Sequence, residues 1–283
     1  MNTKKVCLEV QGKINKHCPM IFQQSTQERG DLAFVPHFMT QTSLPKYHQQ
    51  GVGEYEINIR NKKITIQCPA RIGVPGGYYS RIIFVYLAKL AKTEKTSLIH
   101  IGNSMCEMMQ SMGLSSVGGK NGNIETFKKH FISCINTTIH IEEKQQKETK
   151  FSIIPIIDEA TITDLENWRW DSTIKLSDKF YESIIQKAIP TDIGCIKVLA
   201  PGTLRIDILH FLIYRLYYLK GETLISWKEL QCMFSSPDIP IKNFKSQFKI
   251  ALKETLTFYS TANILIDKKG LILKKSQLYI HKK

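Results

Sequence analysis

The chain has 283 residues, of which 42% are hydrophobic and 23% charged, and its formal net charge at pH 7 is +14. This length and apolar content suit one or two globular domains and argue against intrinsic disorder. A pI near 9.4 is typical of proteins that bind polyanions such as nucleic acids, and the plainer alternative is a basic protein without that role.

Cysteine spacing and the lack of long apolar runs indicate a protein of a reducing compartment. The cysteines number seven, and no two form a CxxC pair, which argues against a zinc ribbon and against a disulfide framework. The N-terminus lacks the apolar segment of a signal peptide, and the longest apolar run, residues 82–88, is too short to cross a bilayer. We therefore expect a cytoplasmic protein that does not associate with a membrane.

The positive charge falls into two blocks. The net charge is +9 over residues 1–150, −3 over residues 151–176 and +8 over residues 177–283. Two basic blocks on either side of an acidic connector suggest two binding modules rather than one diffuse positive surface.

The first half of the chain is expected to contain a partly ordered N-terminal arm, residues 1–50, followed by regular elements. Hydrophobic periodicity and capping residues predict the following elements in chain order: a helix over 79–91, a strand over 98–101, a helix over 104–112 capped by Asn103 or Ser104, a helix over 123–135, and a hairpin of strands 138–143 and 151–157. A strand over 172–176 and a helix over 177–188, capped by Ser177, come next.

The second half repeats the same order of elements. The predicted elements are a helix over 204–219, a strand over 224–226, a helix over 227–234, a helix over 241–258, and strands 262–267 and 271–275 around a turn at 268–270. Helix, strand, helix, helix, hairpin is the layout of a winged helix, a helix-turn-helix variant that binds DNA. We therefore predict an α+β protein of two tandem winged-helix domains, at residues 51–160 and 177–283, joined by a linker at 161–176.

The helix over 241–258 is the strongest candidate for DNA contact. Its apolar residues recur on one face, and its lysines recur on a neighbouring face. The residues assigned to DNA here are Lys242, Asn243, Lys245, Ser246, Lys249 and Lys253, with Lys268 and Lys269 at the hairpin tip. Asn243 and Ser246 are the better candidates for reading bases, and the lysines for phosphates or guanine. The alternative is that the lysines form an ordinary solvated helix face.

The first module contains a weaker version of the same pattern. The residues assigned to DNA there are Lys120, Asn121, Asn123, Lys128 and Lys129, with Lys144 and Lys147 in the hairpin. Because Glu125, Glu142 and Glu143 dilute this charge, a module for dimerisation or protein contact is the alternative.

Catalytic motifs are incomplete in this sequence. The segment 113–121 is similar to a phosphate-binding loop, but its lysine comes one position late and Asn121 occupies the place of the Ser or Thr that binds magnesium. The eight histidines are scattered without an HxH pair, and the acidic residues of 158–171 are not paired for metal binding. We expect no enzyme activity, no cofactor and no metal site.

Four blocks of the sequence occur in the order and at the spacing of one protein family. They are Gly73-Val-Pro-Gly-Gly-Tyr-Tyr-Ser-Arg81; Ile101-Gly-Asn-Ser-Met-Cys-Glu-Met-Met109 with Gly118-Gly119; Ile174-Lys-Leu-Ser-Asp-Lys-Phe180 with Pro190 and Asp192; and Leu204-Arg-Ile-Asp-Ile208 with Ser226-Trp-Lys-Glu-Leu230 and 244–252. Over roughly residues 30–280 the chain resembles plasmid replication initiators of the RepA type. It departs from their pattern in two turns, at 75–77 and 233–236.

The resemblance implies a plasmid-associated bacterial protein with two winged-helix domains, which binds repeats (iterons) of double-stranded DNA at a replication origin. It also implies repression of the protein's own promoter, a homodimer in equilibrium with a monomer, and binding to the host replication initiator and helicase-loading proteins. Two alternatives stay open: a winged-helix transcription repressor of a mobile element, and a protein-interaction scaffold whose charge is incidental.

Overall fold

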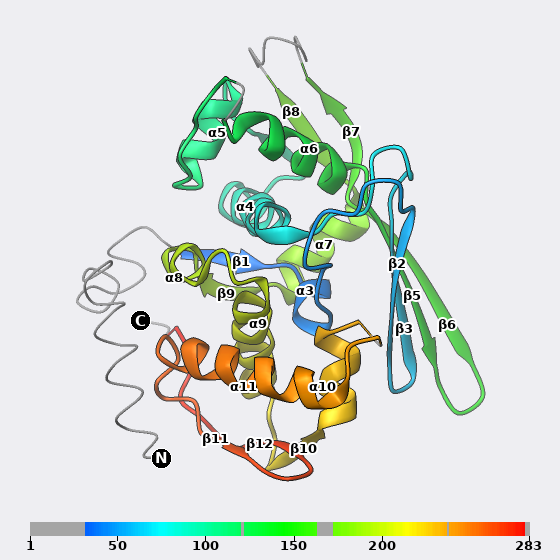
Figure 1. Ribbon diagram of the computed structural model, residues 1–283. Coiled ribbons are helices and arrows are strands. Elements are labelled where there is room, and N and C mark those ends of the chain that lie inside the picture. Colours follow the sequence, from blue (N-terminus) through cyan, green and yellow to red (C-terminus); the bar gives the residue numbers. More distant parts are fainter. Residues whose placement is uncertain (1–31, 120–121, 163–171, 237, 281–283) are drawn as a thin grey trace. The chain divides into compact units, whose positions relative to one another are not determined.

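The computed structural model describes residues 32–119, 122–162, 172–236 and 238–280 (Figure 1). It divides into two compact units. The N-terminal unit contains Ala33–His37 and Leu44–Ala188; of the described residues, the C-terminal unit contains Leu32, Phe38–Ser43 and residues 189–280. None of the helices in the described ranges is both long enough and apolar enough to cross a membrane.

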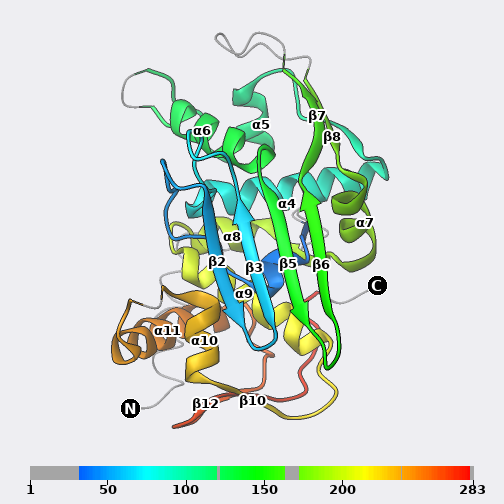
Figure 2. The same cartoon turned by 90° about the vertical axis from the view of Figure 1, so that its right-hand side faces the viewer.

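The largest sheet belongs to the N-terminal unit (Figure 2). It is antiparallel, in the order β2 (Glu54–Ile59), β3 (Lys62–Gln67), β5 (Thr138–Lys144), β6 (Thr149–Pro155). Side chains alternate between its two faces. One face buries Ile57, Ile64 and Ile139, and the other is polar except for Phe151, Ile153 and Pro155 on β6.

Four helices and a second sheet complete this unit. They are α4 (Gly77–Glu94), α5 (Met105–Ser111), α6 (Ile124–Ile135), α7 (Asp178–Lys187), and a sheet in the order β4 (Leu98–His100), β8 (Thr173–Leu176), β7 (Ile157–Thr161), with β1 (Leu32–Val35) at the start of the unit. Helix α4 packs against α6 and α7. The predicted caps are confirmed, because the hydroxyls of Ser104 and Ser177 accept the amide protons of Glu107 and Phe180.

Gly76 and Arg81, both in the first sequence block, have structural roles at the start of α4. A Cβ atom on Gly76 would lie 2.0 Å from the carbonyl oxygen of Tyr47, so only glycine fits there. Arg81 is 1% exposed and donates to the carbonyl oxygens of Leu44 at 2.6 Å and Gly77 at 2.7 Å. This block therefore fixes a loop onto the helix that follows it.

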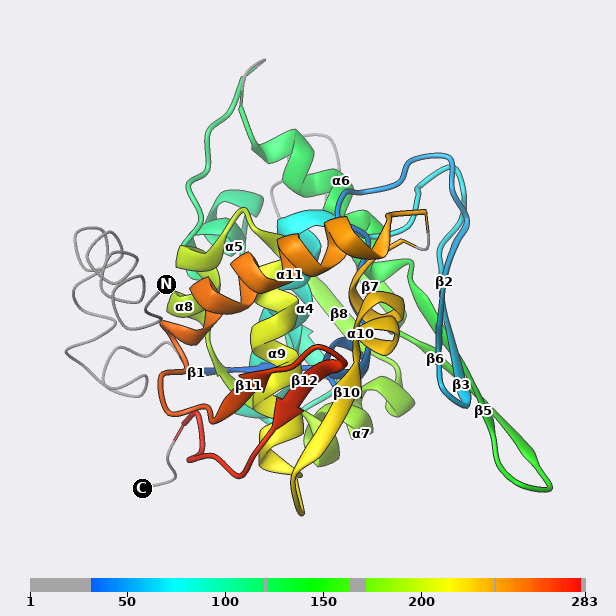
Figure 3. The ribbon, with the colours of Figure 1, turned by 60° about the horizontal axis from the view of Figure 1, so that its bottom comes forward.

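The C-terminal unit is smaller and mostly helical (Figure 3). Its elements are α3 (Phe38–Gln41), β9 (Ile189–Asp192), α8 (Ile193–Leu199), α9 (Thr203–Tyr217), β10 (Thr223–Ser226), α10 (Trp227–Phe234), α11 (Ile241–Leu256), β11 (Ile264–Ile266) and β12 (Gly270–Leu273). Helix α11 packs against α9 and α10. The three strands form an antiparallel sheet in the order β10-β12-β11, whose buried face carries Ile225, Leu271 and Leu273.

The order helix, strand, helix, helix, hairpin occurs in both units, but the strand pairing differs between them. In the C-terminal unit the short strand β10 pairs with β12 of the hairpin. In the N-terminal unit the corresponding strand β4 pairs with β8, and the β5–β6 hairpin joins β3. The predicted winged-helix duplication is therefore not confirmed, although the mixed α and β composition is.

The two units also divide the chain elsewhere than at the predicted linker, residues 161–176. Residues 163–171 of that linker lie outside the described residues, and its last four form β8. The helix α7, expected to open the second domain, belongs to the N-terminal unit. Lys92 of α4 explains this, because its Nζ donates to the carbonyl oxygens of Ile184 and Ile185 in α7, at 3.2 Å and 2.8 Å.

Part of the predicted N-terminal arm is ordered, and two strands of the four-stranded sheet, β2 and β3, were not predicted. The arm was predicted to span residues 1–50. Its first 31 residues lie outside the described residues, and its remainder contains β1 and α3. Strands β2 and β3 had no predicted counterpart. Each is six residues long, and β3 pairs with β5, which lies about 75 residues further along the chain.

Candidate nucleic-acid interface

Helix α11 is held in the C-terminal unit by an aromatic and aliphatic face. Phe244, Phe248 and Leu252 are at most 2% exposed, and the Phe248 ring lies 5.4 to 5.9 Å from the rings of Phe244, Phe234 and Trp227. Near the end of the helix, Thr255 Oγ1 donates to the carbonyl oxygen of Arg205 at 3.1 Å. These contacts leave the opposite face of the helix to solvent.

That opposite face carries a lysine stripe, which we define as Lys242, Lys249 and Lys253 with Ser246 among them. The four positions follow i, i+4, i+7, i+11 spacing and therefore lie in one row along the helix. Lys242, Ser246 and Lys249 are exposed, and Lys253 is half-buried. The structure thus brings together four of the six residues assigned to DNA on this helix.

The other two helix residues, Asn243 and Lys245, lie on opposite flanks of the stripe. At 100° per residue, Asn243 lies about 160° from Lys245 around the helix axis. Asn243 is exposed, as are its neighbours Gln247 and Ile250 on the same flank. A single groove face that includes both Asn243 and Lys245 does not exist on α11.

Trp227, at the start of α10, joins the helix lysines to the hairpin. Its indole lies under two ammonium groups, with Lys245 Nζ 5.5 Å and Lys249 Nζ 5.6 Å from the ring centroid. Its Nε1 donates to the carbonyl oxygen of Asp267 at 3.2 Å, and its backbone N–H donates to the carbonyl oxygen of Lys269 at 3.1 Å. Because cations are attracted to the face of an indole, Trp227 positions two lysines next to the turn that it also binds.

The turn between β11 and β12 presents two further lysines. We call β11, β12 and the turn 267–269 the C-terminal hairpin. Lys268 and Lys269 are exposed at its tip, and Asp267 Oδ1 accepts the amide proton of Lys269 at 2.8 Å. A Cβ atom on Gly270 would lie 1.9 Å from the carbonyl oxygen of Ile225, so the tip is held closely against β10. The predicted basic tip therefore has a defined geometry beside α11.

Sequence reasoning missed Trp227 as part of this site. In the sequence it was only the first residue of the helix predicted over 227–234 and a member of the last resemblance block. In the structure its side chain is 4% exposed. The available signal was its distance of 18 and 22 residues from two lysines, which carries no meaning before the tertiary structure is known.

The residues assigned to DNA in the N-terminal unit are not brought to one place. Lys120 and Asn121 lie outside the described residues. Lys128 and Lys129 are on α6, whereas Lys144 and Lys147 are at the tip of the β5–β6 hairpin, and Figure 2 shows α6 and that tip at opposite ends of the sheet. Lys144 Nζ also lies 3.9 Å from the carboxylate of Glu142.

The loop that is similar to a phosphate-binding loop is organised by Asn123. Its Oδ1 accepts the amide proton of Val117 at 2.9 Å, and its Nδ2 donates to the carbonyl oxygen of Ser115 at 2.8 Å. The side chain amide is therefore used within the loop. In the described part of the chain, no three or more His, Cys, Asp or Glu side chains gather in a way that could hold a metal ion.

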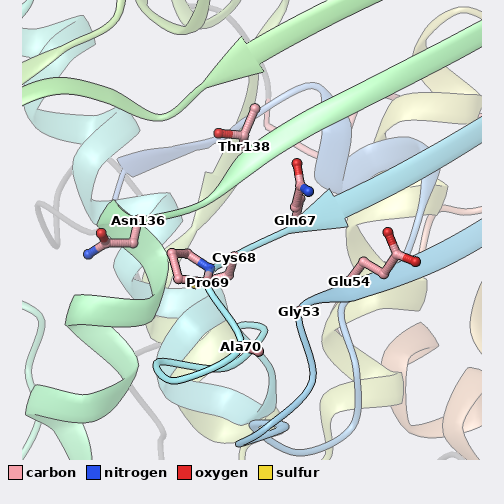
Figure 4. A pocket seen from close by; sticks show the side chains of 8 residues that line it. All are labelled: Gly53, Glu54, Gln67, Cys68, Pro69, Ala70, Asn136 and Thr138. Carbon is pink, nitrogen blue, oxygen red and sulfur yellow. The ribbon is translucent and has the colours of Figure 1, made fainter.

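A pocket of about 670 Å³ lies at one end of the four-stranded sheet (Figure 4). Its polar side chains are Glu54, Gln67, Asn136 and Thr138. Cys68, at its wall, donates to the carbonyl oxygen of Ser133 at 3.7 Å, and burial raises the pKa of its thiol. Because the thiolate is the nucleophilic form, Cys68 is poorly suited to covalent catalysis at neutral pH.

A buried histidine makes the N-terminal unit sensitive to acid. The Nδ1 of His130 lies 2.9 Å from the Ser80 hydroxyl, and its ring centroid lies 5.4 Å from that of His48. Burial, followed by the neighbouring His48, lowers the pKa of His130 from 6.5 to about 4. Between those values the unfolded chain binds a proton that the folded unit does not, so stability falls as pH falls through this window.

We expect the wild type to lose about 2 kcal/mol of unfolding free energy between pH 7 and pH 5 through this one group. His130→Asn should reduce that loss, whereas replacing the exposed His100 with asparagine should not. Urea unfolding followed by circular dichroism at both pH values measures the difference. An identical loss in the wild type and in His130→Asn would show that another group is responsible.

Comparison with known proteins gives a family and a fold. Residues 74–229, more than half of the chain, match the family model described as "Plasmid encoded RepA protein". The matched span starts just before α4 and ends within α10, so it includes neither the lysine stripe nor the C-terminal hairpin. The search of curated proteins found no match.

Two solved structures share the fold of this chain. A crystal structure of a selenomethionine derivative of domains 2 and 3 of RctB has a TM-score of 0.52 and 9% sequence identity, over 85% of this chain and 98% of that one. A second crystal structure, of RctB domains 2–3, has a TM-score of 0.50 and 9% identity, over 84% and 96%. At such low identity the likeness concerns the fold alone.

Proposed function

The chain belongs to the family of plasmid-encoded RepA replication initiators, and we propose that it initiates replication by binding repeated sequences in double-stranded DNA at a plasmid origin. In this proposal the C-terminal unit is a winged helix, α11 is its recognition helix and the C-terminal hairpin is its wing. The protein would act in the bacterial cytoplasm, associated with its plasmid.

The observation that carries the proposal is the joint placement of the lysine stripe and the hairpin tip by Trp227. An amphipathic helix with a solvated lysine face is common by itself. Here the indole of Trp227 contacts Lys245 and Lys249, and its two N–H groups bind the hairpin tip. A helix and a basic turn held rigidly to each other can meet the major groove and the adjacent backbone together.

Affinity and sequence preference would come from different residues. The ammonium groups of Lys242, Lys249 and Lys253 would neutralise phosphates, and Lys268 and Lys269 would bind the backbone beside the groove. Ser246, exposed in the middle of the lysine stripe, is the candidate for a base contact. Asn243 would read a base only at the edge of the same groove, because it lies on the flank away from Trp227.

Origin opening would follow from DNA bending and from recruitment of host proteins. Phosphate contacts on one side of the duplex favour bending where the sequence is easily deformed. We expect no NTPase activity, since the loop at 113–121 departs from the phosphate-binding motif, so the host initiator and helicase-loading proteins would supply the strand-opening machinery. Binding to repeats near its own promoter would also make the protein an autorepressor.

The N-terminal unit has an edge strand suited to homodimer formation. At the turn between β5 and β6, Gln145 N donates to Glu148 O at 2.7 Å, so these two residues form a hydrogen-bonded pair. Hydrogen-bonded and non-hydrogen-bonded pairs alternate along antiparallel strands, and the backbone groups of Thr149, Phe151 and Ile153 therefore point away from β5. Phe151 is 70% exposed and Ile153 is 50% exposed. The carbonyl oxygen of Ile153 already accepts from Lys179 Nζ at 3.2 Å. Pairing of two β6 edges would bury both side chains and satisfy the outward backbone groups of Thr149 and Phe151.

We expect Phe151→Lys with Ile153→Lys to shift the protein from dimer to monomer, by at least tenfold in dissociation constant, because like charges would meet across the two-fold axis. Sedimentation velocity over a range of concentrations measures the shift. Ile250→Lys, at an isoleucine that is 60% exposed on α11, is the matched control and should leave the equilibrium unchanged. Equal self-association of all three proteins would place the dimer interface elsewhere.

A transcription repressor of a mobile element is the second candidate, because it would use the same DNA-binding residues. The two differ in their DNA, since an initiator requires tandem repeats in an origin and a repressor needs only a palindromic operator. A protein-interaction scaffold would show neither preference, and its salt dependence would match that of non-specific binding.

The proposal is tested by fluorescence anisotropy with DNA from the protein's own replicon at several salt concentrations. Tight binding to the repeat-containing segment over a scrambled duplex, together with origin-dependent plasmid maintenance, supports an initiator. Tight binding to a palindrome without any effect on plasmid maintenance supports the repressor. Weak and equal binding to all duplexes contradicts the proposal.

A further inference from the structure

The sheet of the C-terminal unit exposes an apolar row on the face away from its core. Across the three strands, Leu224, Ile272 and Leu265 are directly paired neighbours and therefore share one face. Leu224 is 44% exposed, Leu265 is 49% exposed and Ile272 is half-buried. No element among the described residues covers this row, and Figure 3 shows the sheet in the foreground of the unit. The opposite face is the buried one, with Ile225 and Leu271 at 0% exposure.

The outer edge of the same sheet is open and aliphatic. β11, which consists of Ile264, Leu265 and Ile266, is an edge strand that pairs only with β12 in the described structure. Asp267 N donates to Gly270 O at 2.9 Å, and Lys274 N donates to Asn263 O at 3.0 Å. Because bonded and non-bonded pairs alternate, the amide and carbonyl groups of Ile264 and Ile266 point outward, away from β12.

Lysines lie at both ends of this edge strand. Lys268 and Lys269 follow it at the hairpin tip, and Lys274 and Lys275 are at the base, where Lys274 Nζ is 3.0 Å from a carboxylate oxygen of Glu222. Antiparallel pairing with a second copy of β11 would bring the tip lysines of one chain towards the base lysines of the other. That repulsion disfavours self-pairing and favours a strand whose ends are acidic.

We propose that the β11 edge and the apolar row beside it bind an extended segment of a partner protein, in which three or four aliphatic residues are flanked at both ends by acidic residues. The segment would add a fourth strand next to β11, accept and donate hydrogen bonds at Ile264 and Ile266, and cover Leu265. Its acidic ends would meet the lysines at the tip and base. This inference goes beyond DNA binding. It shares the tip lysines, Lys268 and Lys269, with the proposed DNA site, but the strand edge and the apolar row on which it rests are not part of that site.

The probe for the experiment is a fluorescein-labelled peptide, Glu-Glu-Val-Ile-Val-Ile-Glu-Glu, titrated with the full chain and followed by fluorescence polarisation. Two control peptides accompany it, one with lysine in place of every glutamate and one with methyl groups on alternate backbone amides. Binding of the acidic peptide, at least tenfold tighter than that of either control, is the expected result. Equal affinity for the acidic and the N-methylated peptide would overturn strand addition.

Two variants test the location of the site. Ile266→Pro removes an outward amide donor without removing a bond to β12, and Leu265→Glu places a charge in the apolar row. Both should weaken peptide binding at least tenfold, whereas Ile250→Glu, on α11, should not. Thermal unfolding shows whether each variant is folded, and Leu265→Glu, which changes an exposed side chain, serves if the proline is not tolerated. Unchanged peptide binding in a folded variant would overturn the proposal.

Self-association and DNA provide the remaining outcomes. One outcome is that the wild type forms a dimer at high concentration and the Leu265→Glu variant, whose β6 is unchanged, does not. That result would assign the β11 edge to a second copy of the chain and overturn the partner proposal. Retained binding of Leu265→Glu to origin DNA, with the peptide affinity lost, would support a peptide site separate from the DNA site. Failure of the wild type to bind origin DNA, with peptide binding intact, would contradict the proposed function alone.

Discussion

Replacing Lys242, Lys249 and Lys253 together with alanine is expected to weaken binding to origin repeats by on the order of a hundredfold at physiological salt, and to lower the salt slope by about three. The three ammonium groups lie in one row on the solvent side of α11, so a duplex that meets one of them can meet all three. Fluorescence anisotropy at several salt concentrations measures both quantities. The fold should be unaffected, because Phe244 and Phe248 hold the helix from its opposite face.

A matched triple substitution separates this effect from the simple loss of positive charge. Lys150, Lys175 and Lys187 are exposed lysines of the N-terminal unit that were not assigned to DNA. Their replacement with alanine changes the net charge equally and should change the affinity less than threefold. If both triple variants lose affinity to the same extent, the lysine stripe is an ordinary solvated face and the site lies elsewhere.

Trp227→Ala is expected to have the largest effect of any single substitution in the C-terminal unit. Removing a buried indole costs about 3–5 kcal/mol of unfolding free energy. It also removes the contacts of Lys245 and Lys249 and the hydrogen bond to Asp267, so DNA binding should be lost even in the fraction that stays folded. Denaturant unfolding and anisotropy on the same samples measure the two losses.

Trp227→Phe separates positioning from stability. A phenyl ring keeps most of the packing but cannot donate to the carbonyl of Asp267, so we expect a loss of about 1–2 kcal/mol in stability and roughly tenfold in DNA affinity. Tyr259→Phe is the control, because it also removes one aromatic hydrogen bond, at 2.8 Å to the carbonyl of Gln277, without a contact to the lysines. Equal DNA affinity of the two variants would refute a positioning role for Trp227.

The local features of the C-terminal unit were predictable because they depend on neighbours along the chain. The 3.6-residue apolar period of α11, the lysine spacing and the glycine of the hairpin turn are all visible in one window of sequence. The structure confirms α10 at its predicted bounds and shortens α11 by two residues. The caps at Ser104 and Ser177 follow from the same local chemistry.

Strand partners and unit boundaries could not be predicted in the same way. β4 pairs with β8, across about 75 residues, whereas β10 pairs with β12 of its own hairpin, and this difference removes the symmetry between the two halves. A three-residue strand such as β4 has no sequence signal for its partner, because several edges could accept it. The position of α7 in the N-terminal unit likewise depends on a contact that is distant along the chain: Lys92 of α4 donates to the carbonyl oxygens of Ile184 and Ile185 in the last turn of α7.

The sequence by itself determined the family, the charge and the helix that carries the lysine stripe, since the motifs and periods that define them are contiguous. Only the tertiary structure decided which of the assigned residues act together. It set Lys245 and Lys249 over Trp227, put Asn243 on the other flank, and left the lysines of α6 and of the β5–β6 hairpin at opposite ends of a sheet. The physical reason is that cation–π contacts, edge positions and shared faces depend on distances in space, which spacing along the chain does not encode.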